Sequence, residues 1–277
     1  MKTLRHEHRI PTLYLEHTCI QKKAGVVQAL AAGGSTTLPK EAVSVLLMGP
    51  GTSITHAAVK ALSEAGTLLV WVGAGNTRVY SAGNPLQQNP ARLIQQCVCA
   101  HDTRKRDKVA REMFSRRFGV QVSSDLSVVN LRGMEGARVR AKYRELAKKH
   151  GVLWVKRQGR GAGWSNMDPI NRAISAASAS LSSAALAAVL SAGFSPAVGF
   201  LHSGYERAFV HDIADLYKYK VAVPLAFHVV SKGSPNVEQE TRHLMREALH
   251  KLNLVDKMIQ QAIEVVDAGY RPKKSSR

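Results

Sequence analysis

The spacing of apolar residues changes once along this chain of 277 residues, and this change constrains the fold more than any other feature. Before Ala91 the apolar runs are short and bounded by turn residues, as in the run 43–48, VSVLLM. Such runs indicate buried strands. From Ala91 onward apolar residues recur at helical spacing over long segments, such as 131–150. We therefore expect an α+β protein, with a small β-rich domain at residues 1–88 and a larger all-α domain at residues 89–277.

The remaining elements follow from the same two patterns and from the turn residues between them. Further strands are expected at 12–15, 25–30, 67–72 and 77–80, and a helix capped by Thr52 or Ser53 is expected at 54–65. After a junction at 84–90, helices are expected at 91–109, 111–117 (as a continuation or a new helix), 131–150, 169–192, 237–252 and 255–268. Residues 271–277 form a short basic tail.

The loop Gly49-Pro50-Gly51-Thr52-Ser53 connects an expected strand to an expected helix, a place where phosphate-binding loops also occur. It lacks the Gly-Lys-Ser/Thr ending of a P-loop and the three glycines of a dinucleotide fingerprint. A tight turn before a capped helix is therefore favoured over a nucleotide site.

The charge of the chain indicates a polyanionic partner. Lys and Arg number 39 against 20 Asp and Glu, which gives a formal net charge of +19 and a pI near 10.2. Such a balance favours nucleic acid, with an anionic membrane or ribosomal RNA as alternatives. Residues 101–160 hold 17 of the basic residues and 6 of the acidic ones. This clustering favours a phosphate-binding surface over a set of solvated helix faces.

Cysteine usage and hydropathy indicate a protein of a reducing compartment. Cys19, Cys97 and Cys99 do not form a disulfide framework. Cys97 and Cys99 lack the spacing of a zinc finger, so buried thiols in a helix are favoured over a zinc site for this pair. The N-terminus has no apolar signal region. The most apolar segment, 174–190, is rich in alanine and serine, which predicts a helix that other helices approach closely. We expect a cytoplasmic protein with no membrane partner.

Two carboxylates and a histidine in the C-terminal third suggest a metal site. Asp212 and Asp215 share one face of a helix, and His202 precedes them. Carboxylate oxygens with one imidazole suit a hard divalent cation such as Mg²⁺ or Mn²⁺. Glu135, flanked by glycines at an expected helix start, is a fourth candidate. The alternatives are ion pairs of the aspartates with Lys218, Arg207 or other cations, a core histidine, and a glutamate that complements a helix N-terminus.

Five segments carry a resemblance to a known family. They are GTSITHAAVKALSEAG (51–66), TLLVWVGAGNTRVY (67–80), RGMEGARVR (132–140), INRAISAAS (170–178) and GFSPAVGFLHSGYERAFVHDIADLYK (193–218). In this order and at these distances the chain resembles the CRISPR-associated protein one family of spacer-acquisition integrases, and most closely its type I-E branch.

The resemblance implies a β-rich N-terminal domain and an all-helical catalytic domain. It also implies a homodimer that assembles with the small CRISPR-associated protein two. The metal-binding Glu, His and Asp of the family match Glu135, His202 and Asp215, and Asp212 matches a supporting acidic position beside the site.

DNA contacts are implied at several basic residues. Arg78 matches a basic position associated with DNA contact, and Arg242 is retained at another. Arg138 and Arg140 follow Glu135 on the same expected helix, and they are further candidates. The chain departs from the family at Tyr205, where a lysine is expected, and at Gln239, where a basic residue is common.

These expectations combine into one function. A metal-dependent integrase of CRISPR adaptation would join the 3′-hydroxyl of a short double-stranded DNA fragment, the spacer precursor, to a phosphodiester of the CRISPR array. Basic helices after residue 101 would bind the duplex. Two alternatives remain open: a structure-selective DNA nuclease that uses water as the nucleophile on branched DNA, and a non-catalytic DNA-binding scaffold.

Overall fold

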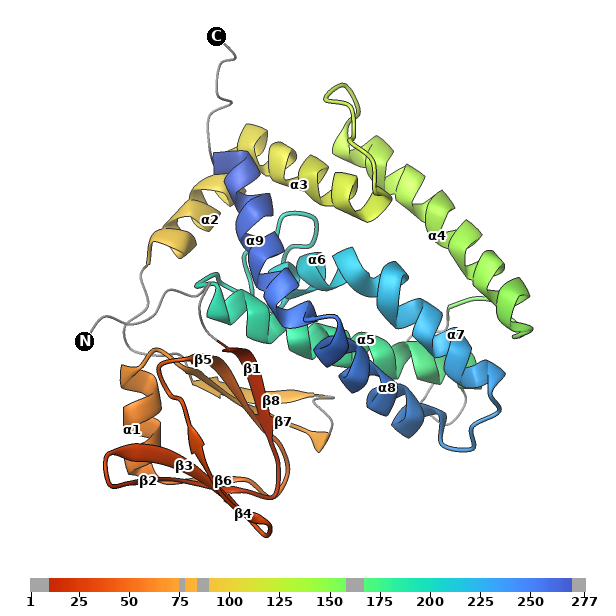
Figure 1. The fold of residues 1–277 in the computed structure, drawn as a ribbon. Coiled ribbons are helices and arrows are strands. Elements are labelled where there is room, and N and C mark those ends of the chain that lie inside the picture. The colour runs from red at the N-terminus through yellow and green to blue at the C-terminus, as the bar shows by residue number, and fades with distance from the viewer. Residues whose placement is uncertain (1–9, 75–77, 84–89, 158–166, 271–277) are drawn as a thin grey trace.

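The computed structural model describes residues 10–74, 78–83, 90–157 and 167–270 (Figure 1). Strands occupy the first part of the chain and helices the rest, so the predicted α+β class is confirmed. The predicted junction at 84–90 lies, except for Pro90, outside the described residues, and so does the predicted tail. The division into two domains therefore stays a prediction.

The N-terminal part consists of two four-stranded sheets and one helix. The first sheet has the order β1 (Ile10–Leu15), β5 (Val43–Met48), β7 (Leu68–Val72) and β8 (Val79–Gly83), and only β8 runs antiparallel to its neighbour. The second sheet has the order β4 (Gly34–Leu38), β3 (Val26–Ala31), β2 (Cys19–Lys23) and β6 (Ser53–Ile54). Helix α1 (His56–Glu64) packs against both sheets.

Strand β5 is apolar on both faces because both faces are covered by other parts of the molecule. Val45 and Leu47 belong to a hydrophobic cluster shared with the helices, whereas Leu46 and Met48 belong to a second cluster with α1 and the second sheet. Side chains alternate between the faces of a strand, so a strand covered on both sides must be apolar throughout. The first sheet is therefore the middle layer of this part of the molecule.

The predicted strands are present, but β2, β4 and the two-residue β6 were missed. Strand β2 ends in the polar run Gln21, Lys22 and Lys23, and β4 is exposed except at Leu38, so β2 and β4 lack the apolar alternation that marks a strand. The cap of α1 was also assigned wrongly, because the hydroxyl of Thr55 accepts the Ala58 amide at 3.3 Å.

The loop at 49–53 is a tight turn, which is the alternative that the sequence favoured. Gly51 has a φ of +70°, and the ring of His17 lies where a side chain at Gly51 would project. The Tyr14 side chain covers Gly49 in the same way. These two side chains occupy the space into which a side chain at either glycine would project.

Helices α2 (Ala91–His101) and α3 (Thr103–Phe118) replace the single helix predicted at 91–109. The break occurs at Asp102, which adopts an extended conformation and accepts the amides of Arg104 and Lys105 at 2.9 and 3.1 Å. This carboxylate caps α3 in the ordinary way. Within α2, Cys99 is buried but Cys97 is exposed, so the prediction of buried thiols was wrong for Cys97.

The remaining helices form one packed group. They are α4 (Val128–His150), α5 (Pro169–Ser191), α6 (Ala208–Tyr217), the π-helical turn η5 (Lys218–Ala222), α7 (Val223–Ser231), α8 (Val237–Lys251) and α9 (Leu254–Tyr270). Helix α4 ends at Gly151 as predicted, with a φ of +64° that a glycine adopts without strain.

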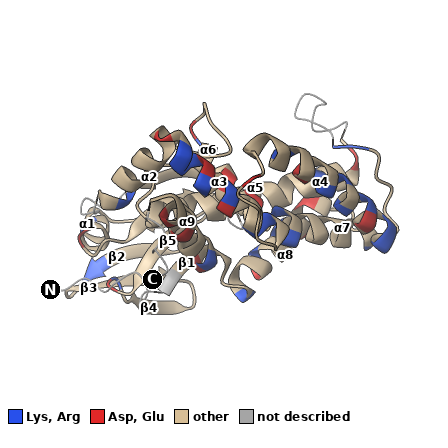
Figure 2. Ribbon diagram, turned by 90° about the horizontal axis from the view of Figure 1, so that it is seen from above, with Lys and Arg blue, Asp and Glu red and all other residues tan. Residues whose placement is uncertain are grey.

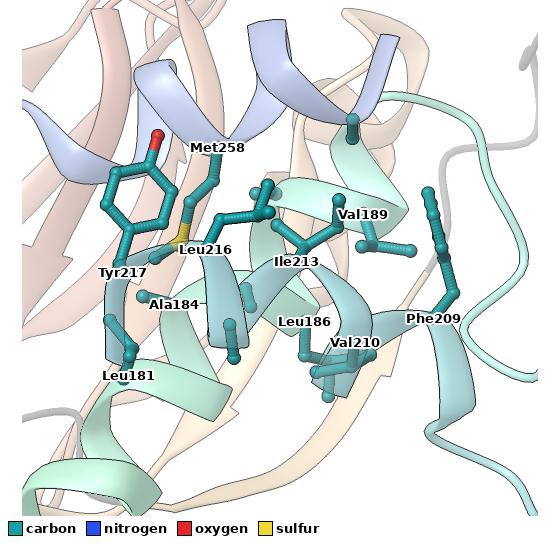
Figure 3. Close-up of a cluster of buried hydrophobic side chains, with 14 of the residues drawn as sticks. Leu181, Ala184, Leu186, Val189, Phe209, Val210, Ile213, Leu216, Tyr217 and Met258 are labelled. Atoms are coloured by element: carbon teal, nitrogen blue, oxygen red, sulfur yellow. The ribbon is translucent and has the colours of Figure 1, made fainter. Parts of the chain in front are cut away.

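Helix α5 lies at the centre of this group (Figure 1). Helices α6, α7, α8 and α9 all pack against it, together with strands β5 and β7. Alanine residues such as Ala184, Ala187 and Ala188 are fully buried along it, which allows close approach on several sides as predicted. Figure 3 shows this packing around Ala184 and Leu186, with side chains of α6 and Met258 of α9.

Among the described helices, only α5 is long and apolar enough to cross a membrane, judged by length and composition. Most of it, 72% of the apolar window, is buried inside the molecule. A buried core helix passes the same test, and the packing around α5 accounts for its composition.

Overpacking tests this arrangement. Ala184→Leu should lower the free energy of unfolding by about 1–3 kcal/mol, because a fully buried position has no space for the added methyl groups. Ala179→Leu, at an exposed position of the same helix, is the matched control and should change little. Urea denaturation followed by circular dichroism measures both. Equal stability of the two variants would contradict the central position of α5.

Candidate active site

Three of the four predicted acidic and histidine residues line one pocket. Glu135 of α4, Asp215 of α6 and His202 of the loop before α6 border a cavity of about 240 Å³. The other residues that line it are Phe114, Arg117, Arg132 and Leu201. Segments far apart in the sequence therefore bring together the residue types that were predicted to act together.

Glu135 lies within α4 rather than at its start. The helix begins at Val128 and is capped by Ser127, so the expectation that Glu135 stands at a helix start was wrong. Consequently Glu135 does not complement a helix N-terminus. No atom lies within 4 Å of the position that a Cβ on Gly133 would take, so the helix surface beside Glu135 is open.

The loop between α5 and α6 positions His202 and is held at its start by α2. The Gln96 side chain, which is fully buried, donates to the carbonyls of Ser195 and Val198 at 3.0 and 2.7 Å. It also accepts the Ser195 amide at 2.8 Å. At Gly199 a Cβ would overlap the His202 carbonyl and lie 2.9 Å from the Ala208 side chain, so the loop requires glycine there.

Asp212 anchors the end of this loop. Its carboxylate is fully buried and accepts the backbone amides of Phe200, Leu201 and His202 at 2.6, 3.1 and 3.0 Å. The same carboxylate lies 2.8 Å from Nδ1 of the His202 ring. Asp212 therefore fixes both the backbone and the ring of His202, which is a supporting position, and it does not line the pocket.

Two arginines satisfy the loop carbonyls on the opposite side. Arg106 of α3 donates to the Phe200 carbonyl at 3.1 Å, and Arg132 of α4 donates to the Leu201 carbonyl at 2.5 Å. With the amides bound by Asp212, the backbone N–H and C=O groups of both Phe200 and Leu201 are paired. The loop is thereby fixed without regular secondary structure.

Asp215 lies one helical turn after Asp212 and faces the pocket. Its Oδ2 is 3.9 Å from Nε2 of His202, the ring nitrogen opposite the one that contacts Asp212. Lys218 approaches Asp215 at 3.8 Å, so the expected pairing of the aspartates with a nearby lysine occurs for Asp215 only. The two carboxylates thus flank the imidazole of His202.

Arg117 is a site residue that the sequence analysis missed. This side chain at the end of α3 is only 6% exposed, and it donates to Glu135 at 2.6 Å and to Asp215 at 3.3 Å. It resembles any other arginine of a basic helix in sequence, and only the folded structure brings it to the two carboxylates.

The donor set fits a divalent cation, although the side chains are not gathered around a single point. Among the described residues, no three His, Cys, Asp or Glu side chains form a group that could hold an ion as they stand. The Arg117 guanidinium nevertheless bridges Glu135 and Asp215, so both carboxylates already bind one positively charged group. Nε2 of His202 adjoins this pair, while Asp212 contacts the other ring nitrogen in the manner of an outer carboxylate. The metal ligands stay a prediction.

The surroundings shift the pKa values of two neighbouring histidines in opposite directions. The hydrogen bond to Asp212 raises the pKa of His202, because the carboxylate stabilises the imidazolium. Burial lowers the pKa of His211, whose ring lies 6.0 Å from that of His202. Tyr205, which stands where a lysine was expected, is exposed and has its ring 6.4 Å from His202.

The basic residues predicted to contact DNA lie outside the pocket. Arg138 and Arg140 are exposed on α4 after Glu135, and the Arg138 guanidinium stacks over the Phe118 ring at 4.4 Å. Arg78 is exposed before β8, and Arg242 is half-buried on α8. Figure 2 shows Lys and Arg residues along α3 and α4, with acidic residues among them. Their role in DNA contact stays a prediction.

A family model decides the affiliation of the chain. The model described as CRISPR associated protein Cas1 matches residues 120–261, a span that includes Glu135, His202, Asp212 and Asp215. The chain belongs to the Cas1 family. This confirms the family named by the resemblance, and the type I-E branch stays a prediction.

Curated relatives extend the match over nearly the whole chain. The CRISPR-associated endonuclease Cas1 of Geobacter sulfurreducens is 38% identical over 97% of this chain and 88% of its own length. The Cas1 endonuclease of Escherichia coli K12 is 38% identical over 94% of this chain and 86% of its own length. The protein is thus a member of a family of CRISPR-associated endonucleases.

Solved structures share the fold. The crystal structure of the TtCas1–DNA complex is similar with a TM-score of 0.85 and 37% identity, over 92% of this chain and 96% of that one. More distant likenesses, which concern the fold alone, are a partial Cas6-RT-Cas1–Cas2 complex (TM-score 0.67, 15% identity, 96% of both chains) and a casposase bound to its integration product (TM-score 0.58, 12% identity, 96% of this chain and all of that one).

Removing the loop anchor tests how His202 is held. Asp212→Ala should lower the free energy of unfolding by about 3 kcal/mol or more, because three backbone amides lose their acceptor. Asp125→Ala, at an exposed position, is the control and should change the stability little. Thermal and urea unfolding measure both, and an Asp212→Ala protein as stable as the control would contradict the anchoring role.

Proposed function

We propose that this Cas1 protein is a metal-dependent DNA integrase of CRISPR adaptation. The 3′-hydroxyl of a short double-stranded fragment attacks a phosphodiester of the CRISPR array and releases the 3′-oxygen of the cleaved strand, so that one bond forms as another breaks. The observation that carries the proposal is the convergence of Glu135, His202 and Asp215 on one pocket of a strongly basic protein. Membership of an endonuclease family supports it.

Each of the three pocket residues has a stated part in this reaction. Glu135 and Asp215 supply carboxylate oxygens from two helices, and His202 supplies Nε2. Bound by these groups, Mg²⁺ or Mn²⁺ supplies Lewis acidity, which lowers the pKa of a hydroxyl and offsets negative charge on the phosphate. Asp212 holds the His202 ring so that Nε2, and not Nδ1, faces the pocket. The oxygen-rich set suits these hard ions.

The basic helices supply affinity for the duplex. Arg138 and Arg140 follow Glu135 on α4 and are exposed, so they can contact phosphates close to the reacting bond. Arg78 lies just before β8 and Arg242 lies on α8, and we propose that both extend the contact along the DNA. The related TtCas1 structure is described as a DNA complex, which supports this assignment.

The same proposal includes the protein partners. The protein acts as a homodimer that assembles with the small CRISPR-associated protein two, here named Cas2, and it binds both spacer precursor and CRISPR array. A structure of this fold described as a Cas1–Cas2 complex is consistent with that assembly. The proposal can be tested with the purified protein alone and with its small partner.

Replacing the pocket residues tests the reaction. Glu135→Gln, His202→Ala and Asp215→Asn should each reduce joining of a 3′-hydroxyl fragment to array DNA by about 100-fold or more, because each removes a proposed cation ligand. DNA affinity should persist, because the duplex is bound by other residues. Glu145→Gln is the matched control, since Glu145 lies exposed on the same helix and pairs with Lys142. Gel assays of labelled DNA measure both properties.

The DNA ends used in this assay separate the alternatives. A fragment that lacks the 3′-hydroxyl should give no joined product. Cleavage of branched DNA that is independent of free 3′ ends, without any joined product, would instead indicate a nuclease that uses water. Normal joining by Glu135→Gln or His202→Ala with Mg²⁺ or Mn²⁺ present would refute the catalytic assignment.

The pH dependence of joining should reflect His202. Because the pKa of His202 is raised, its imidazolium persists to a higher pH than that of an ordinary histidine. The protonated ring cannot bind a cation, so kcat/KM should fall as the pH decreases through this raised pKa. A higher Mn²⁺ concentration should move the fall to lower pH, because the cation and the proton compete. If the pH at which kcat/KM falls does not change with the Mn²⁺ concentration, His202 is excluded as a ligand.

A further inference from the structure

Arg117 places a positive charge between two of the proposed metal ligands. Its Nη1 donates to Glu135 at 2.6 Å and its Nη2 to Asp215 at 3.3 Å, so carboxylates from α4 and α6 share one guanidinium. The side chains of Glu135 and Asp215 are 22% and 20% exposed, and that of Arg117 is 6% exposed. Little water therefore screens these charges from one another.

The guanidinium is not fully satisfied in this position. Its Nε is buried without a hydrogen-bond partner in the described part of the chain. The nearest aromatic ring, that of Phe114, has its centroid 5.7 Å from the guanidinium carbon. A buried donor without a partner carries a desolvation cost. The two ion pairs offset this cost and hold Arg117 in the pocket. If another cation binds the carboxylates, the ion pairs no longer offset the cost.

Arg117 occupies one oxygen of each carboxylate, Oε1 of Glu135 and Oδ2 of Asp215, so a divalent cation that binds through these two oxygens competes with the guanidinium. Both are positive, and the guanidinium lies in direct contact with the oxygens that a cation would bind. Arg117 itself lines the cavity of about 240 Å³, which gives its long side chain space to move. We infer that Arg117 is the internal counter-ion of the metal-free site and that a divalent cation binds Glu135 and Asp215 only by displacing it. This inference rests on the proposed function, since it takes these two residues as ligands.

The arrangement has two effects that follow from one side chain. Without a metal, Arg117 offsets the repulsion between Glu135 and Asp215 and so keeps both of them directed at the pocket. With a metal, the broken ion pairs reduce the net gain of binding, so Arg117 weakens the affinity of the site. It acts as a positioning residue that sets the metal concentration at which the site fills.

Metal titration of the full chain tests the inference directly. The Kd for Mn²⁺, measured by isothermal titration calorimetry without DNA, should decrease by about tenfold or more in Arg117→Met, because the competing charge is removed. Arg116→Met is the matched control. Arg116 is the preceding residue of the same helix, but it pairs with Glu112 at 2.7 Å and Glu264 at 2.8 Å. Its removal should change the Kd by less than about twofold, since these partners lie outside the pocket.

Thermal unfolding gives a second measurement on the same variants. Arg117→Met leaves two carboxylates without their shared counter-ion, so its Tm without metal should be below that of the unmodified protein. Its gain in Tm on addition of Mn²⁺ should be the larger one, because tighter binding to the folded state stabilises it more. Should Arg117→Met fail to fold, Arg117→Lys decides, since a single ammonium cannot donate as a fork to both carboxylates. Tighter Mn²⁺ binding by Arg117→Lys supports the inference, and equal or weaker binding contradicts it.

Glu135→Gln separates this inference from the proposed function. If Glu135→Gln weakens Mn²⁺ binding but Arg117→Met leaves it unchanged or weaker, the counter-ion role is wrong and the metal assignment stands. If Glu135→Gln has no effect on Mn²⁺ binding in either the unmodified or the Arg117→Met background, the metal assignment itself fails, and the inference fails with it.

Discussion

The buried carboxylate of Asp212 is the interaction on which the rest of the site depends. A charged group removed from water is costly unless hydrogen bonds replace its hydration. Here three consecutive backbone amides and the His202 ring provide that replacement. The donors belong to a loop without regular secondary structure, so satisfying the carboxylate also selects one conformation of the loop. The direction of His202, and with it the composition of the pocket, follows from this selection.

Features encoded by local patterns could be predicted, and long-range polar contacts could not. The strand Val43–Met48 and the end of α4 at Gly151 follow from a buried apolar run and a terminal glycine. Residue types made a metal site one of several alternatives, the family resemblance singled out Glu135, His202 and Asp215, and the pocket brings these three together. Gln96 and Arg117 carry no such pattern. Gln96 is 99 and 102 positions away from its partners Ser195 and Val198, and Arg117 is 98 positions away from Asp215.

Polar segments explain the local errors. Strand β4 is exposed at Gly34, Ser35, Thr36 and Thr37 and has a single buried apolar residue, Leu38, so it lacks the apolar alternation that reveals a strand. The break at Asp102 lies in the polar run 101–108, which has no apolar spacing to mark where one helix ends and the next begins, and the capping carboxylate of Asp102 sets the start of α3. In both cases hydrogen bonding to the backbone, rather than apolar burial, decides the structure.

The alanine-rich surface of α5 limits how this protein can diverge. Its buried positions contact four helices and the first sheet at once, so a larger side chain at one of them would displace several neighbours together. Compensation would need coordinated changes on two or more elements, which single mutations do not provide. Sequence change in the family should therefore be slow at these small residues for reasons of volume alone. Invariance along α5 would then indicate packing and not catalysis, even though the helix leads directly into the loop of His202.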